Sequence, residues 1–228
     1  MKPGDKSKIS FSDVGEGLNS VRESISGTHC LMVYPDLVTL RGIYSHYTKT
    51  QLEENNEIVL ILPYYETSDM VRLALSGRNT YSDNSNNPFE YSGIDVNKCE
   101  NEGSLIIMDS LEGYFPSEEQ SDYHDNYGNP KGDLDFMSYL EVILKQAERQ
   151  GKNGVTVLSD LGSFYHYNSH GNQKLIEYER SLPKKYDGMK LKGFCLYHQK
   201  DYERQFNQEQ QALLIDCHSQ NIISETVH

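Results

Sequence analysis

Short apolar segments alternate along this chain with longer segments in which apolar residues recur every three or four positions. The short segments are five strand candidates, and they cover residues 29–34, 57–62, 104–108, 155–159 and 193–197. In the second candidate, every residue after Glu57 is aliphatic. Such continuous apolarity is typical of a strand that is buried on both faces of a parallel sheet.

The longer segments have the spacing and the end signals of α-helices. Asp36 is expected to cap the helix after the first strand, and Ser68 the helix after the second. The clearest helix of the chain ends at Gly151. Its apolar side consists of Phe136, Leu140, Ile143 and Ala147. Further helices are predicted near residues 95–102, 172–186 and 206–217.

Strands that alternate with helices over long crossovers predict a three-layer α/β fold, with helices on both faces of a mainly parallel sheet. No linker divides the chain, so residues 26–223 form one predicted domain. Residues 1–25 are polar and interrupted by glycines, and we expect a flexible N-terminal tail there, with at most a short helix. Two polar inserts, residues 78–93 and 115–133, are expected to be exposed loops.

Charge and composition argue against several classes of function. The net charge of −13 over 228 residues repels phosphate backbones, so nucleic-acid binding by the chain itself is not expected. Four cysteines occur without a C-x-x-C pair, which is unlike a disulfide framework or a zinc ribbon. The sequence contains no apolar leader and no run of about 18 apolar residues. We therefore expect a soluble cytoplasmic protein that does not bind membranes.

The carboxyl ends of parallel strands are where open α/β sheets bind ligands. The residues that follow the strand candidates are rich in tyrosine and acids, and they include Tyr34 and Asp160. With 17 tyrosines, the chain has the means to line a pocket for a small molecule. The alternative is that these positions are polar only because loops face water.

The turn after the first strand is unsuited to a phosphate group. It reads Tyr34-Pro35-Asp36-Leu37 and contains neither glycine nor lysine, whereas a phosphate-binding loop needs both. ATP hydrolysis by the P-loop mechanism is therefore not expected. Asp160 follows the fourth strand, where P-loop enzymes hold their magnesium-binding acid. Without the phosphate loop, a turn or helix-capping role is the favoured interpretation of Asp160.

The histidines and cysteines give weak signals for metal binding or catalysis. His166 and His170 have i,i+4 spacing, but they lie among polar loop residues, and His124 is similarly placed. No carboxylate or thiolate stands at a fixed spacing from them, so neither a metal nor another cofactor is predicted. Cys195 lies within an apolar strand, which predicts a buried and inert thiol. The chain lacks a G-x-S-x-G elbow, and we do not expect it to be an enzyme.

Four short motifs resemble those of the MEDS family, the methanogen and methylotroph DcmR sensory domains. Residues 27–34, GTHCLMVY, are similar to the family's opening G-x-H-x-x-x-x-Y, and residues 175–179, LIEYE, to its L-x-x-Y-E segment. Residues 195–197, CLY, resemble its C-x-Y strand, and His218 stands where a terminal H-P is usual. The order and spacing of the motifs agree over roughly residues 26–223.

The resemblance implies a RecA/KaiC-like core that lacks a phosphate loop and a role in sensing small molecules such as hydrocarbon derivatives. In archaea and bacteria, such domains often adjoin a DNA-binding or histidine-kinase module. This sequence contains neither module, its Asn-rich segment near residue 84 is additional, and Ser219 replaces the terminal proline. The resemblance therefore points to signalling through a protein partner, a kinase or a regulator, rather than to direct control of transcription.

The family's signature positions also carry over residue by residue. They fall on His29, Tyr34, Tyr178, Glu179, Cys195 and Tyr197. The first and fifth strands are neighbours in RecA-like sheets, so His29 and Cys195 are expected to lie close together. Glu179 is expected to orient a histidine or a ligand hydroxyl. Together with Asp160 these residues form the predicted ligand site, and the alternative is that they hold the fold together through buried hydrogen bonds.

The leading interpretation is a small-molecule-sensing domain that acts through a partner protein. Two alternatives remain open at the level of the sequence. One is a nucleotide-binding or hydrolytic enzyme with a degenerate RecA-like site, and the other is a non-catalytic module that self-associates, for example as a homodimer.

Overall fold

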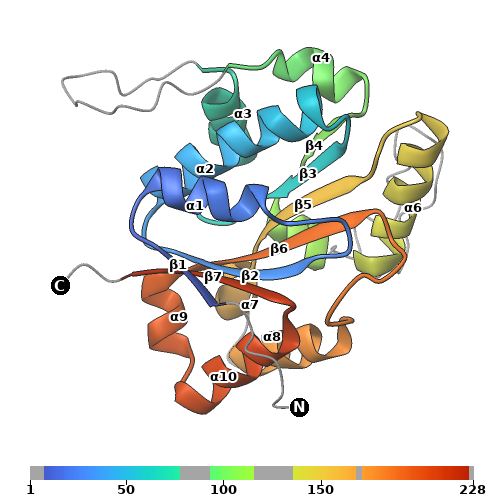
Figure 1. Ribbon diagram of the computed structural model, residues 1–228. Helices are drawn as coiled ribbons and strands as arrows, with labels where there is room; N and C mark the ends of the chain where they lie inside the picture. Colours follow the sequence, from blue (N-terminus) through green and yellow to red (C-terminus); the bar gives the residue numbers. More distant parts are fainter. Residues whose placement is uncertain (1–7, 78–92, 116–135, 168–170, 226–228) are drawn as a thin grey trace, which may run out of the picture.

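One parallel sheet organises the chain, and helices cover both of its faces (Figure 1). This computed structural model describes residues 8–77, 93–115, 136–167 and 171–225. Within these residues the sheet has seven strands, in the order β1-β7-β2-β6-β5-β3-β4. The strands are β1 (Lys8–Phe11), β2 (His29–Tyr34), β3 (Ile58–Leu62), β4 (Leu105–Ile107), β5 (Val155–Asp160), β6 (Leu191–His198) and β7 (Gln220–Ser224).

Successive side chains of each central strand enter different cores, because neighbouring residues of a strand point to opposite faces of the sheet. On β2, Cys30, Met32 and Tyr34 belong to one core. Leu31 and Val33 belong to the other. Both faces are therefore buried, and the three-layer α/β fold predicted from the sequence is confirmed.

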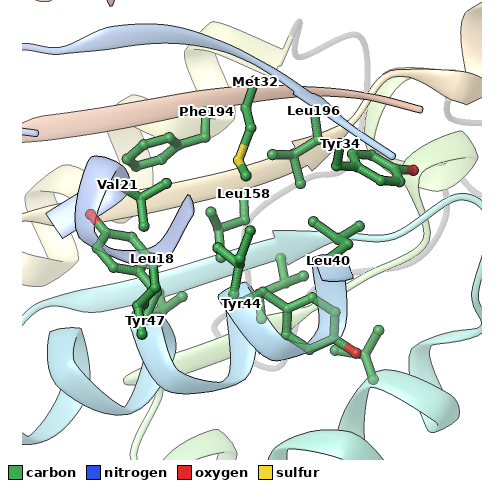
Figure 2. Packing of buried hydrophobic residues seen from close by; sticks show 14 of the residues in the cluster. Leu18, Val21, Met32, Tyr34, Leu40, Tyr44, Tyr47, Leu158, Phe194 and Leu196 are labelled. Carbon is green, nitrogen blue, oxygen red and sulfur yellow. The ribbon is translucent and has the colours of Figure 1, made fainter. Parts of the chain in front are cut away.

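The first face is covered by four helices and a π-helical turn. Figure 2 shows Leu40 and Tyr44 of α2 close to Leu158 of the sheet. Tyr47 of the same helix meets Phe194 edge to face, with ring centroids 5.4 Å apart. Burying each such side chain contributes about 1.5–3 kcal/mol. The elements are α1 (Val14–Arg22), α2 (Leu37–Lys49), η1 (Thr50–Glu54), α3 (Ser68–Leu75) and α4 (Val96–Asn101).

The second face is covered by two groups of helices. In one group, α6 packs on β3 and β5, and Tyr114 of α5 packs beside it. Four others, α7 to α10, pack on β2 and β6, and α8 and α10 bring polar side chains to the sheet there. The elements are α5 (Ser110–Tyr114), α6 (Phe136–Arg149), α7 (Gly162–Tyr167), α8 (Gly171–Ser181), α9 (Gln199–Gln205) and α10 (Gln208–Cys217).

The predicted strands agree closely with the central strands of the sheet. The first candidate coincides with β2, and the other four overlap β3, β4, β5 and β6 with ends one or two residues away. Asp36 caps α2 as predicted, since its carboxylate accepts a hydrogen bond of 2.8 Å from the Thr39 backbone N–H. The prediction for α3 is off by one residue: Thr67, not Ser68, is the cap, and its hydroxyl accepts from the Met70 backbone N–H.

The N-terminal segment differs from the predicted flexible tail. Residues 8–22 form β1 and α1, and β1 pairs with β7 at the edge of the sheet. Gly17 looks like an interruption in the sequence, but it lets α1 approach α2. A Cβ atom at Gly17 would lie 2.6 Å from Ile43 and 3.0 Å from Phe11. Gly17 therefore serves close packing rather than flexibility.

A second unpredicted strand, β7, follows α10 and inserts between β1 and β2. It contains only two aliphatic residues, Ile222 and Ile223, so its strand signal is weak. Ile222 is nevertheless fully buried, and the predicted domain end at residue 223 falls inside this strand.

The two predicted polar inserts lie almost wholly outside the described residues, as do His124 and His170. Among the helices that the structure describes, none combines the length and apolarity needed to cross a membrane.

Candidate functional site

The predicted site residues fall into two separate groups. Tyr34 and Asp160 lie at the carboxyl edge of the sheet, where β2 and β5 end. The other group lies between the sheet and the helices α8 and α10. It consists of His29, Glu179, Cys195 and Tyr197, and Tyr178 lies outside it.

At the carboxyl edge, the chain leaves neighbouring strands toward opposite faces of the sheet. β2 and β3 lead to α2 and α3 on the first face, whereas β5 and β6 between them lead to α7 and α9 on the second. Such switch points are where α/β sheets bind ligands. Tyr34 and Asp160 stand at this place.

Asp160 is the central group of the carboxyl edge. One oxygen of its carboxylate accepts a hydrogen bond of 3.0 Å from the Tyr34 hydroxyl, and the other accepts one of 3.0 Å from the Gly162 backbone N–H. The second bond agrees with the turn role predicted for Asp160. Burial raises the pKa of Asp160 to about 7, although both hydrogen bonds oppose the shift.

Tyrosines and a second acid surround Asp160. Tyr65 follows β3 and donates a hydrogen bond to the carboxylate of Asp201 on α9. Tyr64 packs edge-on against Tyr65, with ring centroids 5.1 Å apart. Glu66, from the same segment, is paired with Arg41 of α2 at 2.6 Å. Burial is the main cause of the raised pKa of Glu66, and Arg41 opposes it.

A cavity of about 20 Å³ lies beneath these residues, and both Asp160 and Glu66 contribute to its wall. The rest of the wall is mainly apolar, with Leu62, Leu158 and Leu196 among its residues. A space of this size holds roughly one water molecule. The described residues therefore leave a small, mainly apolar cavity with two carboxyl groups in its wall, and a larger molecule fits only if the lining residues move.

The N-terminus of α2 agrees with the expected lack of a phosphate site. In this fold, phosphates usually bind the backbone N–H groups of the first helical turn, which have no partner within the helix. One of them, that of Thr39, is bonded to the carboxylate of Asp36. A carboxylate at this position repels an anionic phosphate, so the geometry disfavours nucleotide binding at the first turn.

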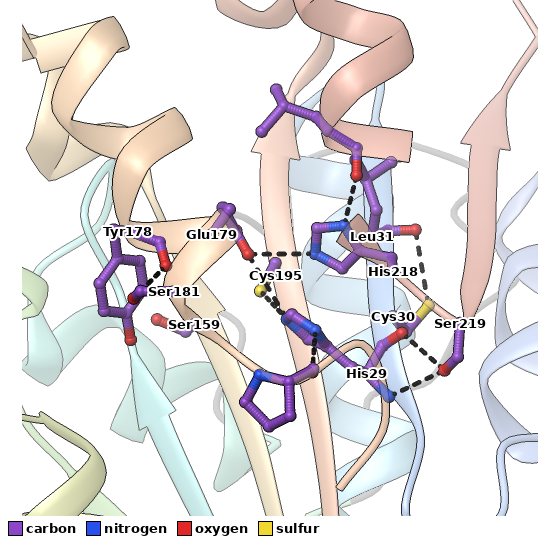
Figure 3. A network of polar contacts seen from close by, with 12 residues as sticks. His29, Cys30, Leu31, Ser159, Tyr178, Glu179, Ser181, Cys195, His218 and Ser219 are labelled. Carbon is purple, nitrogen blue, oxygen red and sulfur yellow. Dashed lines mark hydrogen bonds and ion pairs between the residues drawn. The ribbon is translucent and has the colours of Figure 1, made fainter. Parts of the chain in front are cut away.

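The second group brings together residues from both ends of the chain (Figure 3). His29 begins β2, Cys195 lies in β6, Glu179 lies in α8, and His218 follows the end of α10. We call these four residues the buried cluster. All four are buried, and His29, Glu179 and His218 are 0% exposed. The predicted proximity of His29 and Cys195 is confirmed by a distance of 3.3 Å between Nε2 and Sγ.

Glu179 is the common partner in the buried cluster. One of its oxygens, Oε2, lies 3.4 Å from Nε2 of His29 and 3.4 Å from Nε2 of His218. The other, Oε1, accepts a hydrogen bond of 2.7 Å from the Tyr197 hydroxyl. Glu179 thus contacts two histidines, where the sequence predicts that it orients a histidine or a ligand hydroxyl.

Each histidine ring is held in its orientation by a backbone carbonyl group that contacts Nδ1. Nδ1 of His29 lies 3.1 Å from the Pro183 oxygen, and Nδ1 of His218 lies 2.7 Å from the Leu214 oxygen. Because a carbonyl oxygen can only accept, each Nδ1 must carry the proton. A neutral ring then directs the Nε2 lone pair into the cluster.

Burial controls the protonation of the cluster. It lowers the pKa of His29 below its ordinary value, against the opposing effect of Glu179. It raises the pKa of the Cys195 thiol, and the Glu179 carboxylate raises it further. Burial also opposes ionisation of Glu179, but the neighbouring imidazoles of His218 and His29 together outweigh it and lower the pKa. Glu179 is therefore a carboxylate, and His29 a neutral ring.

Tyr178 points away from the buried cluster. Its ring packs between Tyr114 and Phe164, with centroids 5.4 and 5.3 Å away. It also contributes, with Cys195, to a second cavity of about 20 Å³ on this face of the sheet. Tyr178 and Glu179 are adjacent in a helix and so point in different directions, which explains why only one of them joins the cluster.

Several residues of these sites are absent from the predicted set. His218 is one, although its place in the terminal motif is a usable signal. Tyr65 and Glu66 belong to the general set of residues after strands but carry no individual signal. Asp201 lies one residue beyond the set that follows the fifth strand, residues 197–200.

A scan against protein-family models finds no matching family, and a search of curated proteins finds no significant match.

Proposed function

We propose that this protein is a small-molecule-sensing domain that binds its ligand at the carboxyl edge of the sheet and signals through a partner protein. The observation that carries the proposal is the buried carboxyl group of Asp160, which stands at the switch point among tyrosines. A buried acid at this edge supports ligand recognition because it offers a strong hydrogen-bond acceptor inside an apolar wall.

The chemistry of the pocket selects the class of ligand. Asp160 and Glu66 favour hydrogen-bond donors and cations, and they disfavour phosphates and carboxylates. The leucines of the wall favour an apolar body. A small amine or alcohol with a short hydrocarbon part meets both conditions.

The same site also offers a way for ligand binding to change the position of α9. Tyr65 connects the segment after β3 to Asp201 on α9, which lies on the other side of the sheet edge. A ligand that takes the place of Tyr65 beside Asp160 breaks this connection and frees α9. The fraction of protein with α9 released then depends on how much more tightly the ligand binds this state than the state with the Tyr65–Asp201 bond intact.

Thermal denaturation with a panel of compounds tests the proposal. Short-chain amines and alcohols are expected to raise the melting temperature, and nucleotides with magnesium are not. The ligand effect is expected to disappear in Asp160→Asn and to persist in Asp109→Asn. Asp109 is a suitable control because it caps α5 from the exposed surface, where asparagine caps equally well. Strong stabilisation by ATP and magnesium, or an equal ligand effect in Asp160→Asn, would contradict the proposal.

A further inference from the structure

The buried cluster has the composition of a transition-metal site. It offers two imidazole nitrogens, one thiol sulfur and one carboxylate oxygen, and these four atoms lie within 4.8 Å of one another. Zinc binds these three kinds of atom at about 2.0–2.3 Å, usually with four ligands at the corners of a tetrahedron. Ligands of a tetrahedral ion at those distances stand roughly 3.3–3.7 Å apart.

The measured separations agree with that geometry. Nε2 of His29 lies 3.3 Å from Sγ of Cys195 and 3.4 Å from Oε2 of Glu179. The pair formed by His218 and Glu179 is also separated by 3.4 Å. The remaining separations are at most 4.8 Å, so the longest exceeds the tetrahedral spacing by no more than about 1 Å.

Two atoms of the cluster are buried without a hydrogen-bond partner. Nε2 of His218 and Oε2 of Glu179 are buried and make no hydrogen bond, although they are only 3.4 Å apart. Unsatisfied buried polar atoms are rare and indicate a missing partner. Neither atom has a hydrogen-bond donor in suitable geometry, and a cation between them would bind both.

The surroundings of the cluster are those that metal sites need. Histidine ligands of a metal usually donate their other N–H group to a carbonyl or carboxylate, which fixes the ring. Both histidines do so here, to Pro183 and Leu214. The carboxylate ligand is held in turn by Tyr197. The ligands therefore need no rearrangement of the backbone to receive an ion.

We propose that His29, Glu179, Cys195 and His218 bind one zinc ion, or a similar divalent transition metal, as a closed structural site. The mixture of nitrogen, sulfur and oxygen ligands selects zinc over magnesium or calcium, which prefer oxygen alone. Four protein ligands leave no open position, as in structural zinc sites. On binding, the Cys195 Sγ–H bond breaks, the sulfur keeps the electron pair for the metal, and the proton leaves to solvent.

This inference is independent of the ligand proposed for the carboxyl edge. The cluster lies at the start of β2 and between the sheet and α8, whereas Asp160 lies at the end of β5. If zinc joins β2, β6, α8 and α10, it stabilises the scaffold on which that other site is built.

Cobalt substitution tests the proposal with the full chain. The protein is purified without metal affinity, treated with chelator and reductant, and titrated with Co²⁺. We expect saturation at one equivalent, intense visible bands of tetrahedral Co²⁺, a thiolate-to-metal charge-transfer band, and displacement of all three by Zn²⁺. A spectrum that stays that of octahedral aqueous Co²⁺ would overturn the proposal.

Variants assign the thiolate to Cys195. The triple variant Cys30→Ala, Cys99→Ala, Cys217→Ala leaves Cys195 as the single thiol, and it is expected to keep the charge-transfer band. Loss of the band in this variant, with its fold intact by circular dichroism, would overturn the assignment. Cys195→Ala is expected to lose the band and to bind Zn²⁺ at least about 100-fold more weakly. Cys30→Ala is its matched control, because Cys30 is a buried strand cysteine that faces the other core.

Discussion

His29 and His218 are 189 positions apart in the chain, yet their ring centroids lie 4.2 Å apart. Nε2 of each ring lies 3.4 Å from the same oxygen of Glu179. The first residue of β2 and the residue after α10 are thus joined by one carboxylate from α8. The contact ties an early strand to the segment that follows the last helix of the second face.

Glu179→Ala is expected to destabilise the protein by about 3–5 kcal/mol, because removal of one partner leaves buried polar groups uncompensated. The free energy of unfolding of metal-free protein, from urea denaturation, measures the change. Glu177→Ala is the matched control: Glu177 lies exposed on the same helix, and its loss is expected to cost less than about 0.5 kcal/mol. Equal effects of the two substitutions would show that the cluster does not support the fold.

Tyr197→Phe is expected to cost about 1.5–3 kcal/mol, since it removes a buried hydrogen bond to a charged carboxylate. Tyr202→Phe serves as the comparison, because Tyr202 belongs to the same core but its hydroxyl makes only a long contact of 3.5 Å with Gln211. Its removal is expected to cost less than about 1 kcal/mol. Urea denaturation of both variants at the same pH distinguishes the two bonds, and similar losses would contradict the proposed role of Tyr197.

Asp160 is expected to make stability fall as the pH rises. Its pKa is raised to about 7 in the folded protein, where Tyr34, Tyr65 and Glu66 face it, and is near 4 in the unfolded chain. The folded state therefore holds the extra proton between about pH 4 and pH 7, so the stabilising contribution is complete below this window and lost above it. The loss amounts to a few kcal/mol.

Comparison with Asp160→Asn isolates this titration, because asparagine has no proton to lose. Urea denaturation is measured from pH 4 to pH 8 for both proteins. We expect the stability of the wild type, relative to the variant, to decrease across the window and to become constant above it. A relative stability that is flat with pH would mean that Asp160 has an ordinary pKa.

The apolar pattern predicts the central strands well because those strands are buried on both faces. Every residue of β3 is aliphatic, and its short length and the proline that follows favour a buried strand over a buried helix. The pattern does not predict β1 and β7, because each is short and contains only two apolar residues. Their place in the sheet depends on pairing between the two ends of the chain, which leaves no local signal.

The candidate site likewise contains some contacts that the sequence predicts and others that it does not. His29 and Cys195 are predictable neighbours because β2 and β6 pair in register, His29 with Gly193, two residues from Cys195. His218 is not predictable by this reasoning, because its position depends on the turn between α10 and the unpredicted β7. The contact between Tyr34 and Asp160 likewise requires the order of β2, β6 and β5, which the sequence does not state.

Gly17→Ala is expected to destabilise the protein by about 1–3 kcal/mol, although alanine is the better helix former. The added methyl group would lie 2.6 Å from Ile43, and one of the two helices must then move away. Gly15→Ala is the control on the same helix, since its Cβ would meet only a side-chain oxygen of Asp13, at 3.2 Å. It is expected to be neutral or stabilising by up to about 1 kcal/mol. Thermal or urea denaturation compares the two, and because propensity alone would make both stabilising, opposite signs identify the contact between α1 and α2 as the cause.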